Sequence, residues 1–408
     1  MKKQIVFALF LGFSILVFGK SNAQLALTPP MGWNSWNCFH QKIDEKQIME
    51  IADAMLTSGL KDAGYIYLNL DDCWMSKKRD ENGRLQSDSV RFPSGMKALA
   101  DYVHSKGLKF GIYTAAGTCT CAKGDFPGSW GNEELDIQTF ASWGVDYVKV
   151  DKCKVPSDFE QMKIEKYTLY SNAIKKCGRP MIYSVCAPGS EAWKWAPEIS
   201  QLWRTSTDIS PSWYTQVHDK AKWVPMGIDE IINKNTDLRK YAAPGRWNDP
   251  DMLQVGNGKL TQAENTAHFT MWAMLSAPLI AGNDLRVMKE NVKQILTNKE
   301  VIAIDQDVLG IQALKYKTID SIDVWVKPLM NKKWAVCFLN RAKSAKKINY
   351  DWAKNIVIDE LAKMELNTNK IEYKLRDVWA NKSIGTTKRN LTVSLDSHAV
   401  QLLVLDKK

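Results

Sequence analysis

Hydrophobic and polar positions follow two different periods between about residue 30 and residue 310. Short apolar runs predict buried strands, and the longer stretches between them place apolar residues three and four positions apart, as amphipathic helices do. Helices are predicted at 44–58, 92–106 and 159–176. In the first of these, one helical face carries Ile48, Ile51, Ala52, Met55 and Leu56. The predicted strands are 32–36, 65–71, 108–114, 146–151, 181–186, 202–208, 246–252 and 278–282.

Eight strand–helix units within roughly 280 residues indicate a (β/α)8 TIM barrel. A doubly wound sheet is the main alternative, but no glycine-rich phosphate loop follows the first strand. After Asp305 the pattern changes to short, alternating, β-forming segments, which predicts an antiparallel β-sandwich domain. These segments are 321–327, 333–340, 371–377 and 399–405. We therefore expect an α/β chain with a catalytic barrel at 24–311 and a C-terminal β domain at 312–408.

The first 23 residues have the pattern of a secretory signal peptide. Lys2 and Lys3 precede an apolar run at 5–18, and Ser21-Asn22-Ala23 ends in a small residue where cleavage is expected. The run is too short for a membrane anchor, which needs roughly 20 apolar residues. The sequence thus predicts export, to the periplasm or the medium, and no membrane association after cleavage.

Charge and cysteine content exclude some partners. Removing residues 1–23 lowers the formal net charge from +10 to +7, because three lysines and no acids are lost. The remaining basic residues are scattered, and no basic block interleaves with aromatics, so nucleic acid is not an expected partner. The eight cysteines permit disulfides in an exported chain. Zinc is the alternative, but no cysteine–histidine cluster has suitable spacing. Oligomeric state is left open.

The strand at 146–151 carries the most informative chemistry. Side chains alternate along a strand, so Tyr147, Lys149 and Asp151 face one side while Val148 and Val150 face the other. We expect the lysine to lower the pKa of the aspartate and keep it ionised. A charged carboxylate at the end of a core strand is costly unless it has a function, and nucleophilic attack is the function that we predict.

Polar and aromatic residues recur where the other predicted strands end, which is the catalytic face of a barrel. Carboxylates and cations there can bind sugar hydroxyls, and tryptophan rings can stack on sugar rings. Trp33, Trp36, Trp74 and Trp247 suit stacking, although packing in the core is an equal alternative for each. The residues at these ends are Trp33, Asn34, Asp71, Asp72, Cys73, Trp74, Tyr113, Lys149, Asp151, Cys186, Arg204, Asp208, Asp249 and Asp251.

Glycoside hydrolysis requires two carboxyl groups with different roles. Asp151 fits the nucleophile and Asp208 the acid/base, the latter sharing a strand face with Arg204 and Ser206. A proton donor needs a raised pKa, and a neighbouring anion provides one. A separation near 5–5.5 Å predicts retention of configuration. Metal-assisted hydrolysis at an oxygen cage is the alternative. Its ligands would be Asp71, Asp72, Asp249 and Asp251, but the motifs hold no histidine, and nearby cations would repel a metal.

Five blocks of sequence together resemble glycoside hydrolase family 27, the clan D α-galactosidases and α-N-acetylgalactosaminidases. They are MGWNSW at 31–36, DDCW at 71–74, YVKVDKC at 147–153, WRTSTD at 203–208 and WNDPDML at 247–253. The resemblance covers roughly residues 28–310 and implies a retaining double displacement without a cofactor or metal.

The resemblance also implies roles for individual residues. Asp151 occupies the nucleophile position and Asp208 the acid/base position. Asp71 and Asp72 would bind galactose O6 and O4, Lys149 O3 and O4, and Arg204 O2 and O3. The remaining pocket residues would be Trp33, Tyr113, Cys186, Asp251 and Met252. The disulfides would be Cys38–Cys73 and Cys121–Cys153.

One loop departs from the family pattern. Where α-galactosidases commonly read Cys-Glu-Trp, this chain reads Cys186-Ala187-Pro188-Gly189. Small residues near the sugar 2-position could admit an N-acetyl group, so α-N-acetylgalactosaminidase is an alternative. β-L-arabinopyranosidase is another, although the intact Asp71-Asp72 pair favours a sugar with a 6-hydroxyl. An exported glycan-binding protein is the non-enzymatic alternative. The sequence thus predicts an exo-acting α-galactosidase whose partner is an α-galactoside oligo- or polysaccharide.

Overall fold

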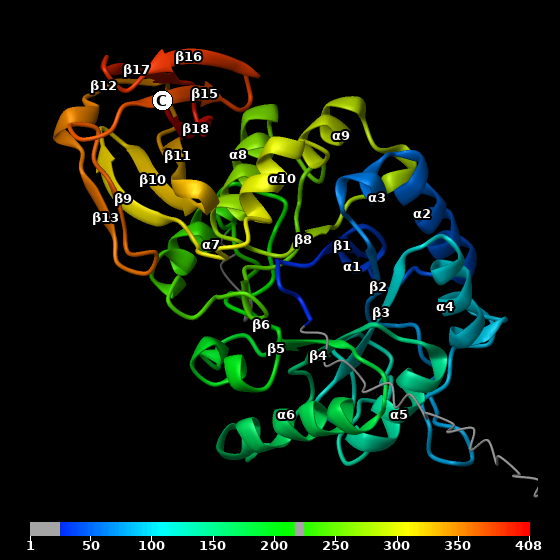
Figure 1. Ribbon diagram of the computed structural model, residues 1–408. Coiled ribbons are helices and arrows are strands. Elements are labelled where there is room, and N and C mark those ends of the chain that lie inside the picture. Colours follow the sequence, from blue (N-terminus) through cyan, green and yellow to red (C-terminus); the bar gives the residue numbers. More distant parts are fainter. Residues whose placement is uncertain (1–24, 217–223) are drawn as a thin grey trace, which may run out of the picture.

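The computed structural model describes residues 25–216 and 224–408 of the chain. The predicted signal peptide at 1–23 lies outside these described residues. A parallel barrel and an antiparallel β domain lie against each other (Figure 1). Within the described ranges, no helix combines the length and apolarity that crossing a membrane requires.

The barrel is an eight-stranded parallel sheet in the order β7-β6-β5-β4-β3-β2-β1-β8. The ring closes just beyond β7, where the Leu253 N–H donates to the Ile280 carbonyl at 2.7 Å and Leu253 forms a parallel bridge with Ala281. This confirms the predicted (β/α)8 barrel. Its strands are β1 (Met31–Asn34), β2 (Tyr67–Leu70), β3 (Lys109–Ala115), β4 (Tyr147–Asp151), β5 (Ile182–Cys186), β6 (Leu202–Arg204), β7 (Trp247–Asp249) and β8 (Leu279–Ala281).

Helices cover the outside of the sheet, with α4, α5 and α6 following one another around it in Figure 1. The second helix starts where the Asp44 side chain accepts the Gln47 N–H at 2.8 Å, and it buries Ile48, Ile51 and Met55. The helices are α1 (Trp36–Phe39), α2 (Glu45–Thr57), α3 (Leu60–Ala63), α4 (Gly95–Ser105), α5 (Glu133–Trp143), α6 (Phe159–Lys176), α7 (Ile228–Asn235), α8 (Gln262–Met274), α9 (Glu290–Leu296) and α10 (Lys299–Asp305).

Barrel strands β6 and β7 end three or more residues before the ends that the sequence pattern predicts. β6 ends at Arg204 rather than at 208, and β7 ends at Asp249 rather than at 252. Pro250 follows β7 and has no N–H for a ladder hydrogen bond. Beyond the two strand ends, Ser206 Oγ donates to the Pro250 carbonyl at 3.2 Å. Asp208 therefore lies on a loop, and the expectation that it shares a strand face with Arg204 is wrong.

The C-terminal β domain consists of one six-stranded antiparallel sheet and two small two-stranded sheets. Every residue of β10 is buried, because Trp325 and Leu329 pack in the barrel core while Val324 and Val326 pack in the domain's own core. The strands are β9 (Leu314–Ile319), β10 (Ile322–Leu329), β11 (Lys333–Asn340), β12 (Lys346–Tyr350), β13 (Val357–Asp359), β14 (Met364–Leu366), β15 (Tyr373–Asp377), β16 (Lys382–Thr386), β17 (Leu391–Leu395) and β18 (Val400–Lys407).

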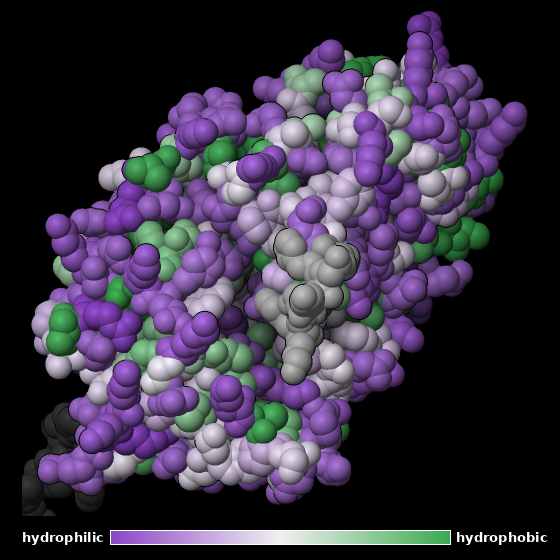
Figure 2. All heavy atoms as spheres, turned by 180° about the vertical axis from the view of Figure 1, so that it is seen from behind, coloured by the Kyte–Doolittle hydropathy of each residue, from purple (hydrophilic) through white to green (hydrophobic). Residues whose placement is uncertain are grey.

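The two parts are joined by polar contacts as well as by apolar packing. The buried Lys327 ammonium on β10 donates to the Ala273 carbonyl and to Ser276 Oγ, both at 2.8 Å. Figure 1 shows the β domain beside α8 and α10. On the surface seen from behind in Figure 2, hydrophilic residues predominate and hydrophobic ones stand in small groups. The predicted domain boundary at 311 and 312 stays a prediction.

Candidate active site

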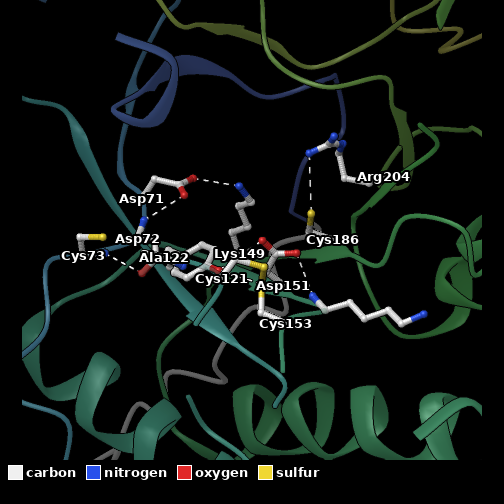
Figure 3. Close-up of a disulfide and its surroundings, with 12 residues drawn as sticks. Asp71, Asp72, Cys73, Cys121, Ala122, Lys149, Asp151, Cys153, Cys186 and Arg204 are labelled. Atoms are coloured by element: carbon white, nitrogen blue, oxygen red, sulfur yellow. Dashed lines mark hydrogen bonds and ion pairs between the residues drawn. A yellow bond between two sulfur atoms is a disulfide. The ribbon is translucent and has the colours of Figure 1, made fainter. Parts of the chain in front are cut away.

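The carboxyl ends of the barrel strands bring most of the predicted site residues together. Asp71 directly follows β2, Asp151 ends β4, Cys186 ends β5 and Arg204 ends β6. The parallel register places Asp151 beside Cys186 and Lys149 beside Tyr113. Figure 3 shows these groups directed toward one region above the sheet. The sequence predicted this clustering from strand ends alone.

Lys149 binds Asp71. Its ammonium group lies 2.9 Å from Asp71 Oδ2, which also accepts the Asn34 side-chain N–H at 2.8 Å. Burial alone would favour the neutral amine, but the Asp71 carboxylate beside it raises the pKa of Lys149 well above its usual value. Lys149 therefore stays charged. Asn34 was not among the predicted binding residues, although its place at the end of β1 is the signal that could have found it.

Asp151 is held by two hydrogen bonds. Its Oδ2 accepts the Tyr113 O–H at 3.2 Å, and its Oδ1 accepts the Lys152 N–H at 2.8 Å. Burial raises the pKa of Asp151 above its ordinary value, and the lowering effect of Lys149 does not offset it. The expectation that Lys149 holds this pKa low is therefore wrong, because desolvation of a buried carboxylate outweighs a cation engaged by another acid.

Asp208 approaches from the loop after β6. Its carboxylate is 46% exposed and lies 3.2 Å from Arg204 Nη2. The negative charge of Asp208 contributes to the raised pKa of Asp151, so the two carboxyl groups interact electrostatically. Asp151 is thus held, only partly buried, at a strand end, while Asp208 lies on a loop.

Arg204 is fixed between acids. Its Nη2 lies 2.8 Å from Asp251 Oδ2, and its Nη1 lies 3.7 Å from the Cys186 sulfur. Burial raises the pKa of Asp251 to about 6 despite the arginine. The Asp251 backbone has a φ of 90°, and Asp251 Oδ1 accepts the Met252 N–H at 2.8 Å. Asp251 thereby orients the Arg204 guanidinium group and fixes the backbone at Met252.

Asp72 uses both carboxylate oxygens on backbone groups. Oδ1 accepts the Cys73 N–H at 2.6 Å, and Oδ2 accepts the Ala122 N–H at 3.1 Å. Burial, followed by the charge of Asp71, raises the pKa of Asp72 to about 6. Asp72 thus attaches the loop after β3 to the site as well as presenting a carboxylate to it.

A disulfide lies directly beside Asp151. Cys121 and Cys153 are bonded, and the Cys153 sulfur lies 3.4 Å from the Tyr113 hydroxyl oxygen (Figure 3). The predicted Cys38–Cys73 disulfide is wrong, since both residues are free thiols and the Cys38 sulfur contacts the Ser35 carbonyl at 3.7 Å.

Potential metal ligands are few in the part of the chain that the structure describes. Among the described residues, three have potential ligand atoms close enough together to hold one ion: Cys121, Asp151 and Cys153. Its two sulfurs are joined to each other, so they offer no thiolate to an ion. The donor set does not fit a metal.

The tryptophans mostly belong to the core. Trp33 is fully buried, and its indole N–H donates to the Asn283 carbonyl at 2.8 Å. Since Asn283 follows β8, Trp33 lies near the catalytic end of the barrel, and its place in the pocket stays a prediction. Trp74 and Trp247 are also fully buried. Trp36 is partly exposed and remains available for stacking.

A cavity lies at the opposite end of the barrel. It has a volume of about 1280 Å³, and its lining includes Met181, Gln201 and Arg246 at the amino ends of β5, β6 and β7. In a barrel that end serves stability rather than chemistry. The carboxylate cluster therefore defines the candidate site.

The arrangement suits a neutral, polyhydroxylated ligand. Two buried cations alternate with carboxylates, so hydroxyl groups can donate to the acids and accept from Lys149 and Arg204. Two further carboxyl groups, Asp151 and Asp208, differ in burial and interact with each other. Such a pair in a sugar-binding site is the requirement for glycoside hydrolysis.

Comparison with known proteins agrees with this chemistry. Residues 28–307 match the family model described as "Alpha galactosidase A", and residues 319–405 match "Alpha galactosidase C-terminal beta sandwich domain". The chain is 47% identical to "Alpha-galactosidase A" of Cellvibrio japonicus, with 100% of both chains covered.

Two solved structures share the fold. "Alpha-galactosidase I" from Mortierella vinacea is 36% identical with a TM-score of 0.85, covering 94% of this chain and 98% of that one. The Saccharomyces cerevisiae α-galactosidase, whose structure is described with raffinose, is 30% identical with a TM-score of 0.85 and the same coverage.

Proposed function

We propose a retaining double displacement by Asp151 and Asp208 for this chain, which belongs to the Alpha galactosidase A family and hydrolyses α-galactosides. One observation carries the proposal: the two carboxyl groups interact at the catalytic end of the barrel, where two hydrogen bonds fix Asp151 at the end of β4 and Asp208 approaches from a loop with a side chain that is 46% exposed. A nucleophile benefits from a fixed, desolvated position, and an acid/base must exchange protons with water.

In the first step, Asp151 attacks the anomeric carbon of galactose while Asp208 gives its proton to the departing glycosidic oxygen. The C1–O bond breaks and a covalent β-galactosyl ester of Asp151 forms. In the second step Asp208 takes a proton from water, whose oxygen attacks C1 and releases Asp151. The product is α-galactose, so configuration is retained.

Sugar recognition is proposed for the surrounding groups. Asp71 and Asp72 accept hydrogen bonds from the 6- and 4-hydroxyls, and the two buried cations bind the remaining ring hydroxyls. Lys149 serves O3 and O4, and Arg204 serves O2 and O3. The pocket wall is assigned to Tyr113, Cys186, Asp251 and Met252.

Small α-galactosyl sugars of the raffinose type are the proposed substrates, since a relative is described with raffinose. We also propose export through the segment at 1–23. Because the loop after Cys186 has small residues, the substrate test compares p-nitrophenyl α-galactoside with its 2-acetamido analogue. A preference for the analogue contradicts the proposed specificity.

Azide separates the two carboxyl roles. With an activated aryl galactoside, Asp151→Ala should lose activity and regain turnover with azide by forming β-galactosyl azide. Asp208→Ala should instead give α-galactosyl azide, because azide attacks the covalent intermediate. Product configuration is read by NMR. The reverse pattern, or full activity of Asp151→Ala, contradicts the assignment.

A further inference from the structure

The loop that carries Asp208 is built from two paired segments, 208–214 and 226–229. The Met226 N–H donates to the Asp208 carbonyl and the Ser210 N–H donates to the Met226 carbonyl, both at 2.8 Å. Further along, the Asp229 N–H donates to the Trp213 carbonyl at 2.9 Å. The backbone position of Asp208 therefore depends on how this pair of segments is held.

The C-terminal β domain holds the first segment through His398, in the turn between β17 and β18. The imidazole stacks on the Trp213 ring with centroids 4.8 Å apart, and its Nε2 lies 2.9 Å from the Tyr214 hydroxyl oxygen. His398 is only 8% exposed and has a φ of 58°, a left-handed conformation that is uncommon for residues other than glycine. Such a conformation persists when the surrounding contacts determine it.

The barrel fixes the other side of the same imidazole. His398 Nδ1 lies 2.7 Å from Glu264 Oε1, on the first turn of α8. Glu264 also belongs to the capping box of that helix, with Thr261 as its partner. Since a carboxylate only accepts, Nδ1 carries a hydrogen and donates it to Glu264. His398 thus links a rigid helix end to the Asp208 loop.

Arg341, just after β11, holds the second segment. Its Nε lies 2.8 Å from Asp229 Oδ1, and its Nη2 donates to Asn233 Oδ1 at 2.9 Å. The Arg341 carbonyl oxygen also lies 3.4 Å from the Tyr214 hydroxyl oxygen. Both paired segments are thereby attached to the β domain at adjacent points.

We propose that His398 is a positioning residue for the acid/base, so that the C-terminal β domain takes part in catalysis by fixing the loop of Asp208. This inference rests on the proposed role of Asp208. His398 touches neither substrate nor reacting atoms. Its effect passes through Trp213 and Tyr214 to the backbone of the loop.

The test compares two substrates that differ in whether the leaving group needs a proton from the acid/base. The 2,4-dinitrophenolate group of an aryl galactoside departs without acid assistance, whereas cleavage of raffinose requires a proton on the departing oxygen. For both substrates, kcat/KM reports the first bond cleavage. His398→Ala should lower kcat/KM for raffinose by about tenfold or more, since a misplacement near 1 Å costs up to about 100-fold. The activated substrate should change less than about threefold.

Matched variants make the result specific. Tyr214→Phe removes only the hydroxyl group and should show a smaller loss of the same selective kind. His398→Gln can still donate to Glu264 and accept from Tyr214, so it should restore most of the raffinose activity. Arg376→Met breaks another contact between the two parts of the chain, to Glu300, and should leave the ratio between substrates unchanged. Circular dichroism and melting confirm that each variant is folded.

Asp208→Ala separates the two proposals. If it shows no preference for the activated substrate, the proposed function fails. The positioning role of His398 is overturned if Asp208→Ala shows that preference but the folded His398→Ala and Tyr214→Phe variants do not. Equal loss of activity on both substrates in these two variants also overturns it.

Discussion

Lys149 and Asp71, 78 residues apart in sequence, form a 2.9 Å ion pair across the top of the barrel. The pair joins β4 to the end of β2 and leaves Lys149 acting on Asp151 only through space. The cation therefore serves two carboxyl groups in different ways, by contact with one and by its field on the other.

Lys149→Met should separate these effects. The sugar would lose the hydrogen bonds proposed for the Lys149 ammonium, so kcat/KM should fall by about 10- to 100-fold, since a hydrogen bond to a charged group contributes about 1.5–3 kcal/mol. Loss of the positive charge should also raise the pKa of Asp151 further, moving the acid limb of the pH profile to higher pH. Lys152→Met is the control, because that ammonium pairs with the exposed Glu160. An unmoved acid limb contradicts the field effect.

Activity should fall steeply as pH drops through about 6. Burial raises the pKa of Asp72 and of Asp251 to about 6, and raises that of Asp151. A carboxyl with a raised pKa takes up its proton at higher pH, so several groups lose their charge over one range. The slope of log kcat/KM against pH should exceed one there. A limb of unit slope centred near pH 4, the ordinary carboxyl range, argues against this.

The Cys121–Cys153 disulfide should support both stability and activity. It closes a 32-residue separation and holds the chain just after Asp151. Replacing both cysteines by serine should lower the free energy of unfolding by about 2–4 kcal/mol and reduce kcat, measured by urea denaturation and aryl galactoside kinetics. Cys177→Ser should change neither. Peptide mass mapping should find the other cysteines as free thiols, and a Cys38–Cys73 crosslink would contradict the structure.

Lys327 should couple the β domain to the barrel. Lys327→Met leaves the buried Ala273 carbonyl without its donor and removes the positive charge that acts through space on Asp305. The free energy of unfolding should fall by about 1–3 kcal/mol, the cost of a buried polar group left unsatisfied. The double variant with Asp305→Asn should lose less than the sum of the single changes, because removing both charges avoids an unpaired one. Additive losses from urea denaturation argue against coupling.

Strand-level features could be predicted from the sequence, whereas loop geometry could not. Alternation along 146–151 and the recurrence of acids at strand ends placed Lys149, Asp151 and Arg204 together, because every strand of a parallel barrel ends on one face. Asp208 was misplaced because Pro250 and Ser206 end the pairing early. Sequence spacing does not report such contacts between different segments.

Two other errors have the same origin. The raised pKa of Asp151 depends on how completely the fold removes water, not on the adjacent lysine alone. Disulfide pairing likewise requires the distance between two sulfurs rather than their positions in the chain.

The last strand of the chain, β18, sits between β15 and β11 in its sheet. Until residues 400–407 are available, the sheet exists only as two unjoined halves, β15–β16 and β9–β11. A chain cut before residue 400 therefore lacks the central strand of this sheet, and nothing then joins β15 to β11.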